Sequence, residues 1–373
     1  MKKLFVALFV VCALCIAGEA IDSEGMAANF VQGEVGGTPV RFCDVRKAPF
    51  VVTGFPFCAG EDQPLRRLPS DLTKAEVNAG ALSQAQCHSG GAVLFRTDSP
   101  VIALRASATN LKTMDRMPAS GVFGYDLYER RPDGTERFIN NTRVKDGTAR
   151  VGGPLARGMA DYILYLPLYS GAECLEIGVS PDASFETPTP QRLPKPIVFY
   201  GSSITQGGCA SRPANTYTTM ICRALDAPQV NLGFSGSACG EPAIARAIAT
   251  LDASLLVIDY DHNAPSVKFL ADTHEPFFRI IREARPDLPV IFISRPDTMD
   301  GGVAPRREVI RKTYENAVAA GDRNVYFIDG EALFGPGGQN FCTVDGTHPN
   351  DLGFYRMYEG ILPVVRQALH LDE

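Results

Sequence analysis

The second half of the chain alternates short apolar segments with helical ones, and this alternation limits the possible folds more than any other feature of the sequence. Buried strands are predicted at residues 197–200, 230–232, 255–259, 290–294 and 325–328, and helices at 276–285, 306–319 and 351–369. Repeated βα units favour a parallel sheet with helices on both faces. Functional groups in such folds gather at the carboxyl ends of the strands.

The first half has a different pattern, with short β-rich segments and little helical periodicity between them. We predict strands at residues 50–57, 92–97, 101–106, 122–128, 162–168 and 175–179. Turn sequences such as Asp98-Ser99-Pro100 and Pro132-Asp133-Gly134 separate some of them. This pattern is typical of an antiparallel β-sandwich.

Four prolines fall within residues 180–195, which have few bulky apolar residues and are the best candidate for a linker. A length of 373 residues also favours two domains over one. We therefore expect a β-sandwich over residues 21–180, a proline-rich linker over 181–195 and an α/β domain over 196–373.

The N-terminus has the pattern of a secretory signal peptide. Lys2 and Lys3 precede an apolar run over residues 4–17, and Gly18-Glu19-Ala20 places small residues where a signal peptidase cleaves. The apolar run is short for a membrane anchor and no basic cluster follows it. We expect residues 1–20 to be removed from a secreted or periplasmic protein, and no other stretch is apolar enough to span a membrane.

Composition excludes several classes of protein. The hydrophobic fraction of 45% and the charged fraction of 21% are those of a globular protein. A net charge of −6 argues against nucleic acid as a partner. Of ten cysteines, eight lie beyond the expected signal peptide, and their spacing is compatible either with disulfides or with buried thiols. None of these eight cysteines forms a metal-type Cys-x-x-Cys, and we expect neither a metal nor a cofactor.

Polar residues follow four of the predicted strands. Ser203 comes after the first, in Gly201-Ser202-Ser203, and Gly236 lies in a glycine-containing loop after the second. Asn263 follows the third strand, and the last precedes Asp345 and His348. A serine becomes nucleophilic when a base takes its proton, so Ser203 and His348 suggest a serine esterase. Gly-Ser-Ser alone is equally compatible with a structural turn, while a phosphate-binding loop would need a Gly-Lys-Ser/Thr ending.

The order Ser203, Gly236, Asn263, Asp345 and His348 resembles the SGNH hydrolases, also called the GDSL esterases and lipases, over residues 196–370. The resemblance implies a flavodoxin-like, three-layer α/β/α domain. Two blocks depart from the family pattern. Ser202 stands where aspartate is usual, which leaves the nucleophile in place, and Asp261-His262-Asn263 replaces the common Gly-Asn-Asp.

The first half extends the resemblance. Gly124-Tyr125-Asp126-Leu127-Tyr128 is similar to the Gly-x-Asp-Leu-Tyr signature of an N-terminal β domain found in one bacterial branch of these hydrolases, and residues 95–100 and 201–212 fit the same branch. This implies a jelly-roll-like β-sandwich. It also implies an exported esterase of short acyl groups, with acetylated carbohydrates as the expected substrates.

The family assigns a role to each site residue. Ser203 is the expected nucleophile, His348 its base, and Asp345 the acid that orients the imidazole. The backbone N–H groups of Ser203 and Gly236 and the side-chain amide of Asn263 are the expected oxyanion hole.

Other residues have open interpretations. His262 is expected to shape the pocket, whereas surface or structural roles are the default for His88, His274 and His370. Cys209 and Cys239 lie on loops that border the site, where a disulfide is conceivable. Asp126 is interpreted mainly as a structural hydrogen-bond partner; the alternative is that the β domain forms a wall of the cleft or holds a sugar chain.

Two other functions are compatible with the same sequence. One is a long-chain lipase or thioesterase that uses the same residues, and the other is a non-catalytic carbohydrate-binding protein on the same fold. In each case the expected partner is an acylated small molecule or a polysaccharide.

Overall fold

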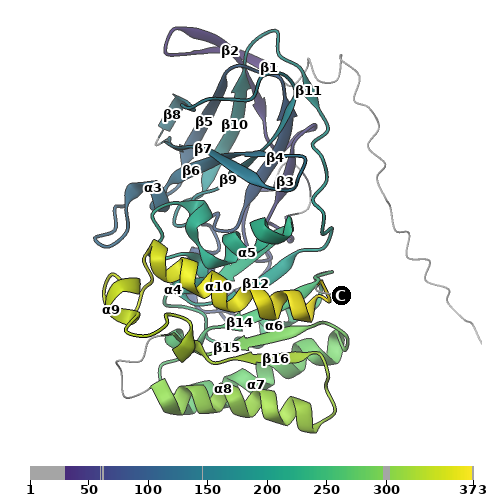
Figure 1. Ribbon diagram of the computed structural model, residues 1–373, viewed down its shortest axis with the longest axis vertical. Coiled ribbons are helices and arrows are strands. Elements are labelled where there is room, and N and C mark those ends of the chain that lie inside the picture. The colour runs from purple at the N-terminus through teal and green to yellow at the C-terminus, as the bar shows by residue number, and fades with distance from the viewer. Residues whose placement is uncertain (1–29, 59, 61–62, 145, 297–302, 372–373) are drawn as a thin grey trace, which may run out of the picture.

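The computed structural model describes residues 30–371 apart from 59, 61–62, 145 and 297–302. The expected signal peptide at residues 1–20 lies outside the described residues. A β-sandwich from the first half of the chain stands on an α/β layer structure from the second half (Figure 1). No helix among the described residues is long and apolar enough to cross a membrane.

The second half forms a five-stranded parallel sheet in the order β13-β12-β14-β15-β16. Its strands are β12 (Ile197–Gly201), β13 (Gln229–Gly233), β14 (Leu255–Asp259), β15 (Val290–Ile293) and β16 (Val325–Ile328). In chain order this is 2-1-3-4-5, the flavodoxin-like arrangement. Strands β12 to β15 are buried along their whole length, which explains why β12, β14 and β15 are mostly apolar. In β13 the buried Gln229 and Asn231 are hydrogen-bonded within the protein.

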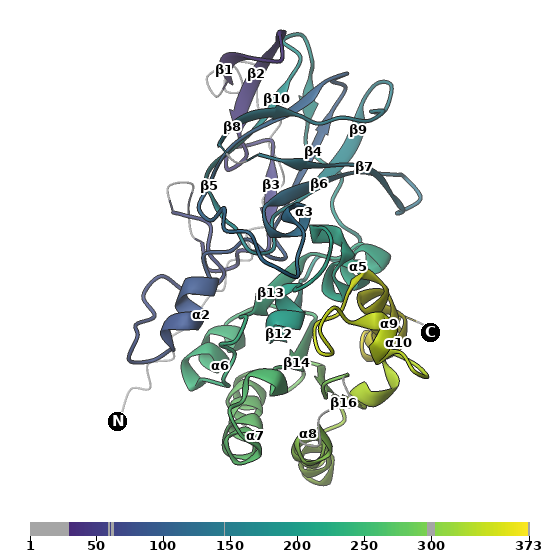
Figure 2. The same ribbon diagram turned by 90° about the vertical axis from the view of Figure 1, so that its left-hand side faces the viewer.

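Helices cover both faces of this sheet, with α6, α7 and α8 on one side and α5 and α10 on the other (Figure 2). These helices are α5 (Tyr217–Leu225), α6 (Pro242–Ala249), α7 (Val267–Ala284), α8 (Val303–Ala319) and α10 (Asp351–Ala368). Alternate residues of β12 belong to the hydrophobic cores on the two faces of the sheet. Val198 and Tyr200 pack towards α6 and α7, whereas Ile197 and Phe199 pack towards α5 and α10. Each such side chain contributes about 1.5–3 kcal/mol when fully buried.

The first half is a sandwich of two antiparallel sheets, as predicted. One sheet has the order β1-β2-β10-β5-β8 and the other β11-β4-β9-β6-β7, with β3 beside β4. The strands are β1 (Phe30–Val35), β2 (Thr38–Asp44), β3 (Val51–Thr53), β4 (Ala92–Thr97), β5 (Ile102–Ala108), β6 (Gly124–Arg130), β7 (Glu136–Arg143), β8 (Asp146–Arg150), β9 (Ala160–Tyr165), β10 (Ala172–Val179) and β11 (Phe185–Glu186). Phe95, Leu104, Leu164 and Ile177 are among the buried residues between the sheets.

Several elements differ from the prediction. Strands β1, β2, β7, β8 and β11 had no counterpart among the predicted segments. Strand β11 lies within the expected linker and pairs with β4, so this stretch is partly integrated into the sandwich. Helix α7 begins at Val267 rather than at Pro276, because the side chain of Ser266 caps its N-terminus and the proline lies inside the helix.

Short helices complete the chain: α2 (Ala79–Gln84), α3 (Ala119–Val122), α4 (Ser203–Gln206) and α9 (Gln339–Cys342). Parts of the first half also enter the two cores of the α/β sheet. Leu68 and Val77 pack with the α6 face, and Met117, Phe123 and Leu168 pack with the α5 and α10 face. The halves of the chain therefore share their hydrophobic cores.

Candidate active site

Three polar side chains form a continuous hydrogen-bonded series at the carboxyl edge of the parallel sheet. The hydroxyl oxygen of Ser203 lies 2.9 Å from Nε2 of His348. Nδ1 of the same ring lies 2.9 Å from Oδ2 of Asp345. The structure thus brings together the serine, histidine and aspartate that the sequence singled out.

The sharp turn after β12 presents Ser203. The backbone N–H of Ser202 donates to the carbonyl of Asp259 at 3.0 Å, and its side chain caps α4 by accepting from the N–H of Ile204. A Cβ atom at Gly201 would overlap the hydroxyl of Thr205 and the Asp259 carbonyl, so only glycine fits there. Ser203 is consequently the first residue of α4, with 8% of its surface exposed.

A tight turn holds Asp345 against His348. Oδ1 of Asp345 accepts the backbone N–H groups of Thr347 at 3.0 Å and His348 at 2.7 Å, while Oδ2 faces the imidazole. Burial raises the pKa of this carboxyl, but the hydrogen bonds from His348 and Thr347 outweigh burial and lower it to about 2. Asp345 is therefore ionised throughout the neutral range and can stabilise an imidazolium.

The loop after β13 carries Gly236, whose φ of +68° places it in the left-handed region that favours glycine. Across the described residues, neither the N–H of Gly236 nor that of Ser203 has a hydrogen-bond acceptor. The side-chain amide of Asn263 donates to the carbonyl of Phe234 at 2.9 Å. Because an amide has two N–H donors, this bond leaves one for a ligand while it ties Asn263 to the Gly236 loop.

Buried polar residues that the sequence did not single out brace this loop. Arg67, fully buried, donates to the carbonyl of Gly233 at 2.7 Å, and burial lowers the pKa of its guanidinium to about 10. Oε1 of Gln206 accepts the backbone N–H of Ser235 at 2.9 Å, and its Nε2 donates to Oε1 of Gln84 at 2.8 Å. Segment 67–87 of the first half thus supports the loop that carries Gly236.

The other candidate histidines have different surroundings. His88 and His274 are buried, and burial lowers the pKa of each to about 4, which keeps them neutral in structural positions. His274 bonds the hydroxyl of Thr313 at 2.9 Å. His262 lies in the short turn that carries Asn263, and His370 follows α10.

Family models match both halves of the chain. Residues 194–366 match the GDSL-like lipase/acylhydrolase family, and residues 40–185 match the GxDLY family, described as the N-terminus of SGNH-hydrolase-type esterases. The chain belongs to the GDSL-like hydrolases. It is accordingly an esterase-type enzyme of the SGNH class.

Solved structures resemble this hydrolase along most of its length. A protein described as a GDSL-like lipase from Bacteroides ovatus is 28% identical, with a TM-score of 0.80 and coverage of 89% of this chain and 98% of the other. A salicylyl-acyltransferase from a tetracycline biosynthetic pathway is 23% identical, with a TM-score of 0.74 and coverage of 89% and 97%. An acetyl xylan esterase from the rumen bacterium Butyrivibrio proteoclasticus shares the fold at 14% identity, with a TM-score of 0.57 and coverage of 88% and 99%. No curated protein matches the chain.

The Gly-x-Asp-Leu-Tyr segment of this GDSL-like hydrolase lies on β6 at the contact with the α/β half. The buried carboxylate of Asp126 accepts the backbone N–H of Ala214 at 2.9 Å and a hydrogen bond from Arg212 at 3.1 Å. The hydroxyl of Tyr128 accepts from Arg212 at 2.5 Å and from Arg223 at 3.3 Å. These contacts agree with the structural interpretation of Asp126.

The eight described cysteines of the hydrolase are all free thiols, so the conceivable bridge between Cys209 and Cys239 is not formed. Their backbones have separate partners. The N–H of Cys209 donates to the carbonyl of Pro349 at 3.2 Å, whereas that of Cys239 donates to the carboxylate of Glu241 at 3.3 Å. Burial and the nearby Asp345 raise the pKa of the Cys209 thiol to about 11, so it stays protonated.

Among the described residues of the hydrolase, a group of residue types that can bind a metal consists of Asp259, Asp261 and His262. Their possible ligand atoms lie within 4.8 Å of one another. Their contacts are to protein. Oδ2 of Asp259 accepts from the hydroxyls of Tyr217 at 3.0 Å and Thr205 at 3.2 Å. Asp261 accepts the N–H of Arg295 at 3.2 Å. These contacts give the acidic residues a role in holding the loops of the site.

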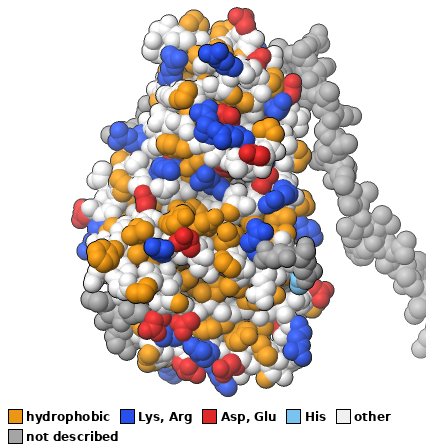
Figure 3. Space-filling model, in the orientation of Figure 1, with side chains coloured by type: hydrophobic (Ala, Val, Ile, Leu, Met, Phe, Trp, Pro, Cys, Tyr) orange, Lys and Arg blue, Asp and Glu red, His pale blue; other side chains and the backbone are white. Residues whose placement is uncertain are grey.

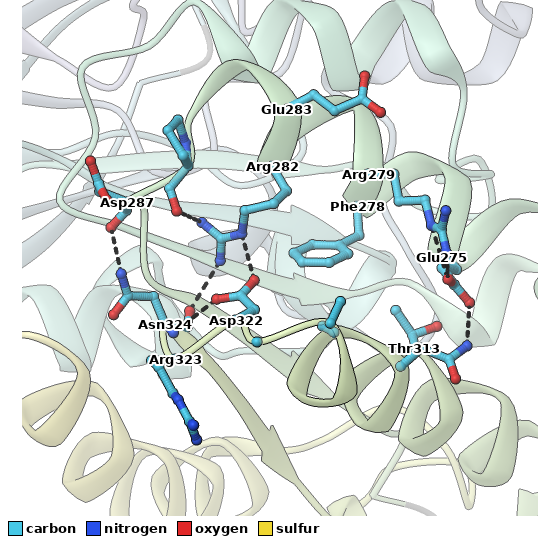
Figure 4. A pocket seen from close by; sticks show the side chains of 15 residues that line it. Glu275, Phe278, Arg279, Arg282, Glu283, Asp287, Thr313, Asp322, Arg323 and Asn324 are labelled. Atoms are coloured by element: carbon cyan, nitrogen blue, oxygen red, sulfur yellow. Dashed lines mark hydrogen bonds and ion pairs between the residues drawn. The ribbon is translucent and has the colours of Figure 1, made fainter.

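A surface pocket of about 540 Å³ lies between α7 and α8 (Figure 4). Asp287 and Asn324 line it and precede β15 and β16, which places the pocket at the amino ends of the strands. Arg282 and Asp322 pair across it at 2.7 Å. The pocket is therefore at the opposite edge of the sheet from Ser203.

Proposed function

We propose that this protein is an exported serine esterase that hydrolyses short acyl esters, chiefly acetyl esters on carbohydrates. The observation that carries the proposal is the unbroken series from Ser203 Oγ through the His348 ring to Asp345, with distances of 2.9 Å at both steps. A serine needs this arrangement of base and orienting acid to attack an ester.

In the proposed reaction, Nε2 of His348 takes the hydroxyl proton as Oγ of Ser203 bonds to the ester carbonyl carbon. The carbonyl electron pair moves onto oxygen, and collapse of this oxyanion breaks the bond to the alcohol, which leaves with the proton from His348. A water then attacks the acyl-serine and gives its proton to His348. The second collapse releases the acid and returns the proton to Ser203.

The oxyanion of both steps needs hydrogen-bond donors that are fixed in advance. The backbone N–H groups of Ser203 and Gly236, neither of which has an acceptor among the described residues, are suited to this task. The second N–H of the Asn263 amide is the proposed third donor. Its bond to the Phe234 carbonyl holds Asn263 against the Gly236 loop.

Two observations favour a carbohydrate as the alcohol part of the substrate. The fold is shared with an acetyl xylan esterase. In addition, Tyr355 and Tyr358 of α10 line a pocket of about 440 Å³ together with polar residues such as Asn215 and Arg223. Tyrosine rings beside hydrogen-bonding groups are suited to a sugar ring, which has both apolar and polar faces.

This pocket adjoins the segment that carries the proposed base. Asn215 donates to the carboxylate of Asp351 at 3.0 Å. Asp351 is three residues after His348 and is the first residue of α10. Tyr355 is one helical turn further along and 47% exposed. Hydrophobic side chains gather over α5 and α10 in the space-filling view (Figure 3). We propose that a glycan chain whose ester lies at Ser203 contacts this surface with its neighbouring sugar units.

Export and domain division complete the proposal. We infer cleavage after residue 20, followed by a sandwich over 21–180, a connection over 181–195 and a hydrolase domain over 196–373. N-terminal sequencing of the exported protein tests the cleavage, because a retained Lys2 and Lys3 would contradict it.

An acetate-release screen over acetylated glycans tests the activity, with Ser203→Ala as the matched control. We expect acetate from at least one glycan with the wild-type protein and none above background with the variant. A fluorophosphonate probe should label the wild type alone, whereas absent labelling would favour a non-catalytic carbohydrate-binding protein. Preference for p-nitrophenyl palmitate over acetate would favour a lipase. Acetyl transfer to an added alcohol in place of hydrolysis would favour an acyltransferase.

A further inference from the structure

We propose that Arg116, from the loop between β5 and α3 of the sandwich, is a positioning residue for the acid–base pair of the hydrolase. The inference rests on the proposed function of Ser203, Asp345 and His348. Nη1 of Arg116 donates to Oδ2 of Asp345 at 2.7 Å. That oxygen is also the one that faces Nδ1 of His348 at 2.9 Å.

The contacts of Asp345 show what Arg116 adds. Oδ1 accepts two backbone N–H groups of its own turn, and Oδ2 accepts from the imidazole and from the guanidinium. When both oxygens of a carboxylate accept hydrogen bonds from different directions, the orientation of the carboxylate plane is fixed. Without Arg116, Oδ2 would keep the imidazole as its one described partner. The orientation of the His348 ring towards Ser203 would then depend on the turn at residues 345–348 alone.

The sandwich fixes the position from which Arg116 reaches this carboxylate. The next residue, Met117, is 4% exposed and packs in the core of the α5 and α10 face. Three residues further on, the hydroxyl of Ser120 donates to the carbonyl of Ser211 at 2.6 Å. Arg116 therefore extends from an anchored segment, although its own side chain is 63% exposed.

The segment at residues 209–211, which accepts the hydrogen bond from Ser120, also contacts residues on either side of the start of α10. The backbone N–H of Ser211 donates to the carboxylate of Asp351 at 2.8 Å, and that of Cys209 donates to the carbonyl of Pro349 at 3.2 Å. Segment 209–211 thus holds the chain immediately after His348. Arg116 contacts the first residue of the turn at 345–348, segment 209–211 contacts the residues just after that turn, and both are tied to the same part of the first half.

Because Arg116 is largely exposed, its effect on catalysis can be distinguished from an effect on folding stability. An ion pair with one largely exposed partner adds little to folding stability, because solvent screens it and the arginine loses side-chain entropy. A small displacement of a catalytic base can nevertheless slow a reaction by about 100-fold. Loss of Arg116 should therefore change turnover and leave the melting temperature almost unaltered.

The test compares Arg116→Met and Arg116→Lys with Arg131→Met, using p-nitrophenyl acetate. Arg131 is exposed in the β6–β7 turn, and its guanidinium has no ion pair within the described chain. We expect Arg116→Met to lower kcat about 10- to 100-fold with KM within twofold of wild type. Arg116→Lys, which keeps a charged donor, should recover most of the loss. Added guanidinium should partly rescue Arg116→Met, and Arg131→Met should behave as wild type.

An unchanged kcat in Arg116→Met would overturn the inference, as would a rise in KM alone, which would make Arg116 a substrate contact. A matching loss of melting temperature that Arg116→Lys does not restore would assign it a purely structural role and also overturn it. Ser203→Ala and fluorophosphonate labelling, run in parallel, report on the proposed function separately. If the wild type is neither active nor labelled, the proposed function fails and the inference about Arg116 fails with it.

Discussion

Asp126 and Arg212 form an ion pair of 3.1 Å in which the carboxylate is completely buried. The aspartate belongs to the sandwich and the arginine to the loop after α4, so this pair fastens one half of the hydrolase to the other. Met117, Phe123 and Leu168 of the first half pack in the same core as α5 and α10. Deleting residues 21–190 would expose that core, so the role of the sandwich is best tested with single substitutions.

Replacing Asp126 with alanine should destabilise the protein strongly. The substitution leaves Arg212 without its charged partner and removes the acceptor of the Ala214 N–H. Breaking a buried ion pair costs about 3–5 kcal/mol, and we expect the lower end because Arg212 is partly exposed. Urea unfolding measures the loss. Asp133→Ala, in an exposed turn, is the control, and a change below about 0.5 kcal/mol for Asp126→Ala would contradict the fastening role.

Asn263→Ala should reduce kcat by about 10²- to 10³-fold, as expected for loss of one oxyanion donor. The bond to the Phe234 carbonyl offers a competing explanation, namely that Asn263 only braces the Gly236 loop. Asn263→Asp removes both bonds, because a carboxylate has the same shape and cannot donate. The melting temperature therefore separates the two explanations, since a lost brace lowers it together with kcat, whereas a lost oxyanion donor lowers kcat alone. We expect steady-state kinetics to show similar losses of kcat for Asn263→Ala and Asn263→Asp, and thermal unfolding to show similar melting temperatures for the two variants. Substantial activity in Asn263→Asp would exclude the amide as a donor.

The sequence predicted the parallel sheet well because β12, β14 and β15 are buried along their whole length and are therefore mostly apolar. Strands β14 and β16 match the predicted ranges 255–259 and 325–328 residue for residue. The candidate site residues could be proposed from the sequence for a related reason. Ser203, Gly236 and Asn263 each follow a strand, and parallel topology brings those strand ends to one edge.

Other features have no local signature. Strand β7, with the sequence ERFINNTR, is mostly polar and gains its structure by pairing with β6. Arg67 contacts Gly233, and Arg116 contacts Asp345, across 166 and 229 residues of chain. Such contacts depend on how the sandwich docks onto the α/β sheet. No pattern around either arginine indicates its partner.

Asp259 should make folding stability depend on pH. Burial raises the pKa of its carboxyl from 3.8 to about 7, so between these values the folded protein keeps a proton that the unfolded chain releases. The contribution of Asp259 is thus complete below pH 3.8 and is lost as the pH rises towards 7. Asp259→Asn should flatten this part of the stability profile, measured by urea unfolding at pH 4.5, 6 and 7.5. Asp252→Asn, at an exposed position, should retain the wild-type slope, and an equal slope in Asp259→Asn would refute the assignment.

Tyr355 offers a test of carbohydrate binding that is independent of the chemical step. It lines the pocket beside α5 and α10, and its ring is the exposed member of the pair it forms with Tyr358 at 5.7 Å. If a glycan stacks there, Tyr355→Ala should raise KM for an acetylated polysaccharide roughly tenfold, equivalent to about 1.4 kcal/mol. The same variant should hydrolyse p-nitrophenyl acetate as the wild type does, because this small ester does not reach the pocket.

Two matched variants make the Tyr355 result specific. Tyr355→Phe keeps the ring and should keep the wild-type KM for the polysaccharide, whereas Leu352→Ala removes a similarly exposed side chain from the same helix outside the pocket lining. Acetate release over a range of polysaccharide concentrations gives KM for each variant. If Tyr355→Ala has the wild-type KM, or if Leu352→Ala raises KM equally, the glycan does not stack on Tyr355. The aromatic pocket would then not support a carbohydrate substrate.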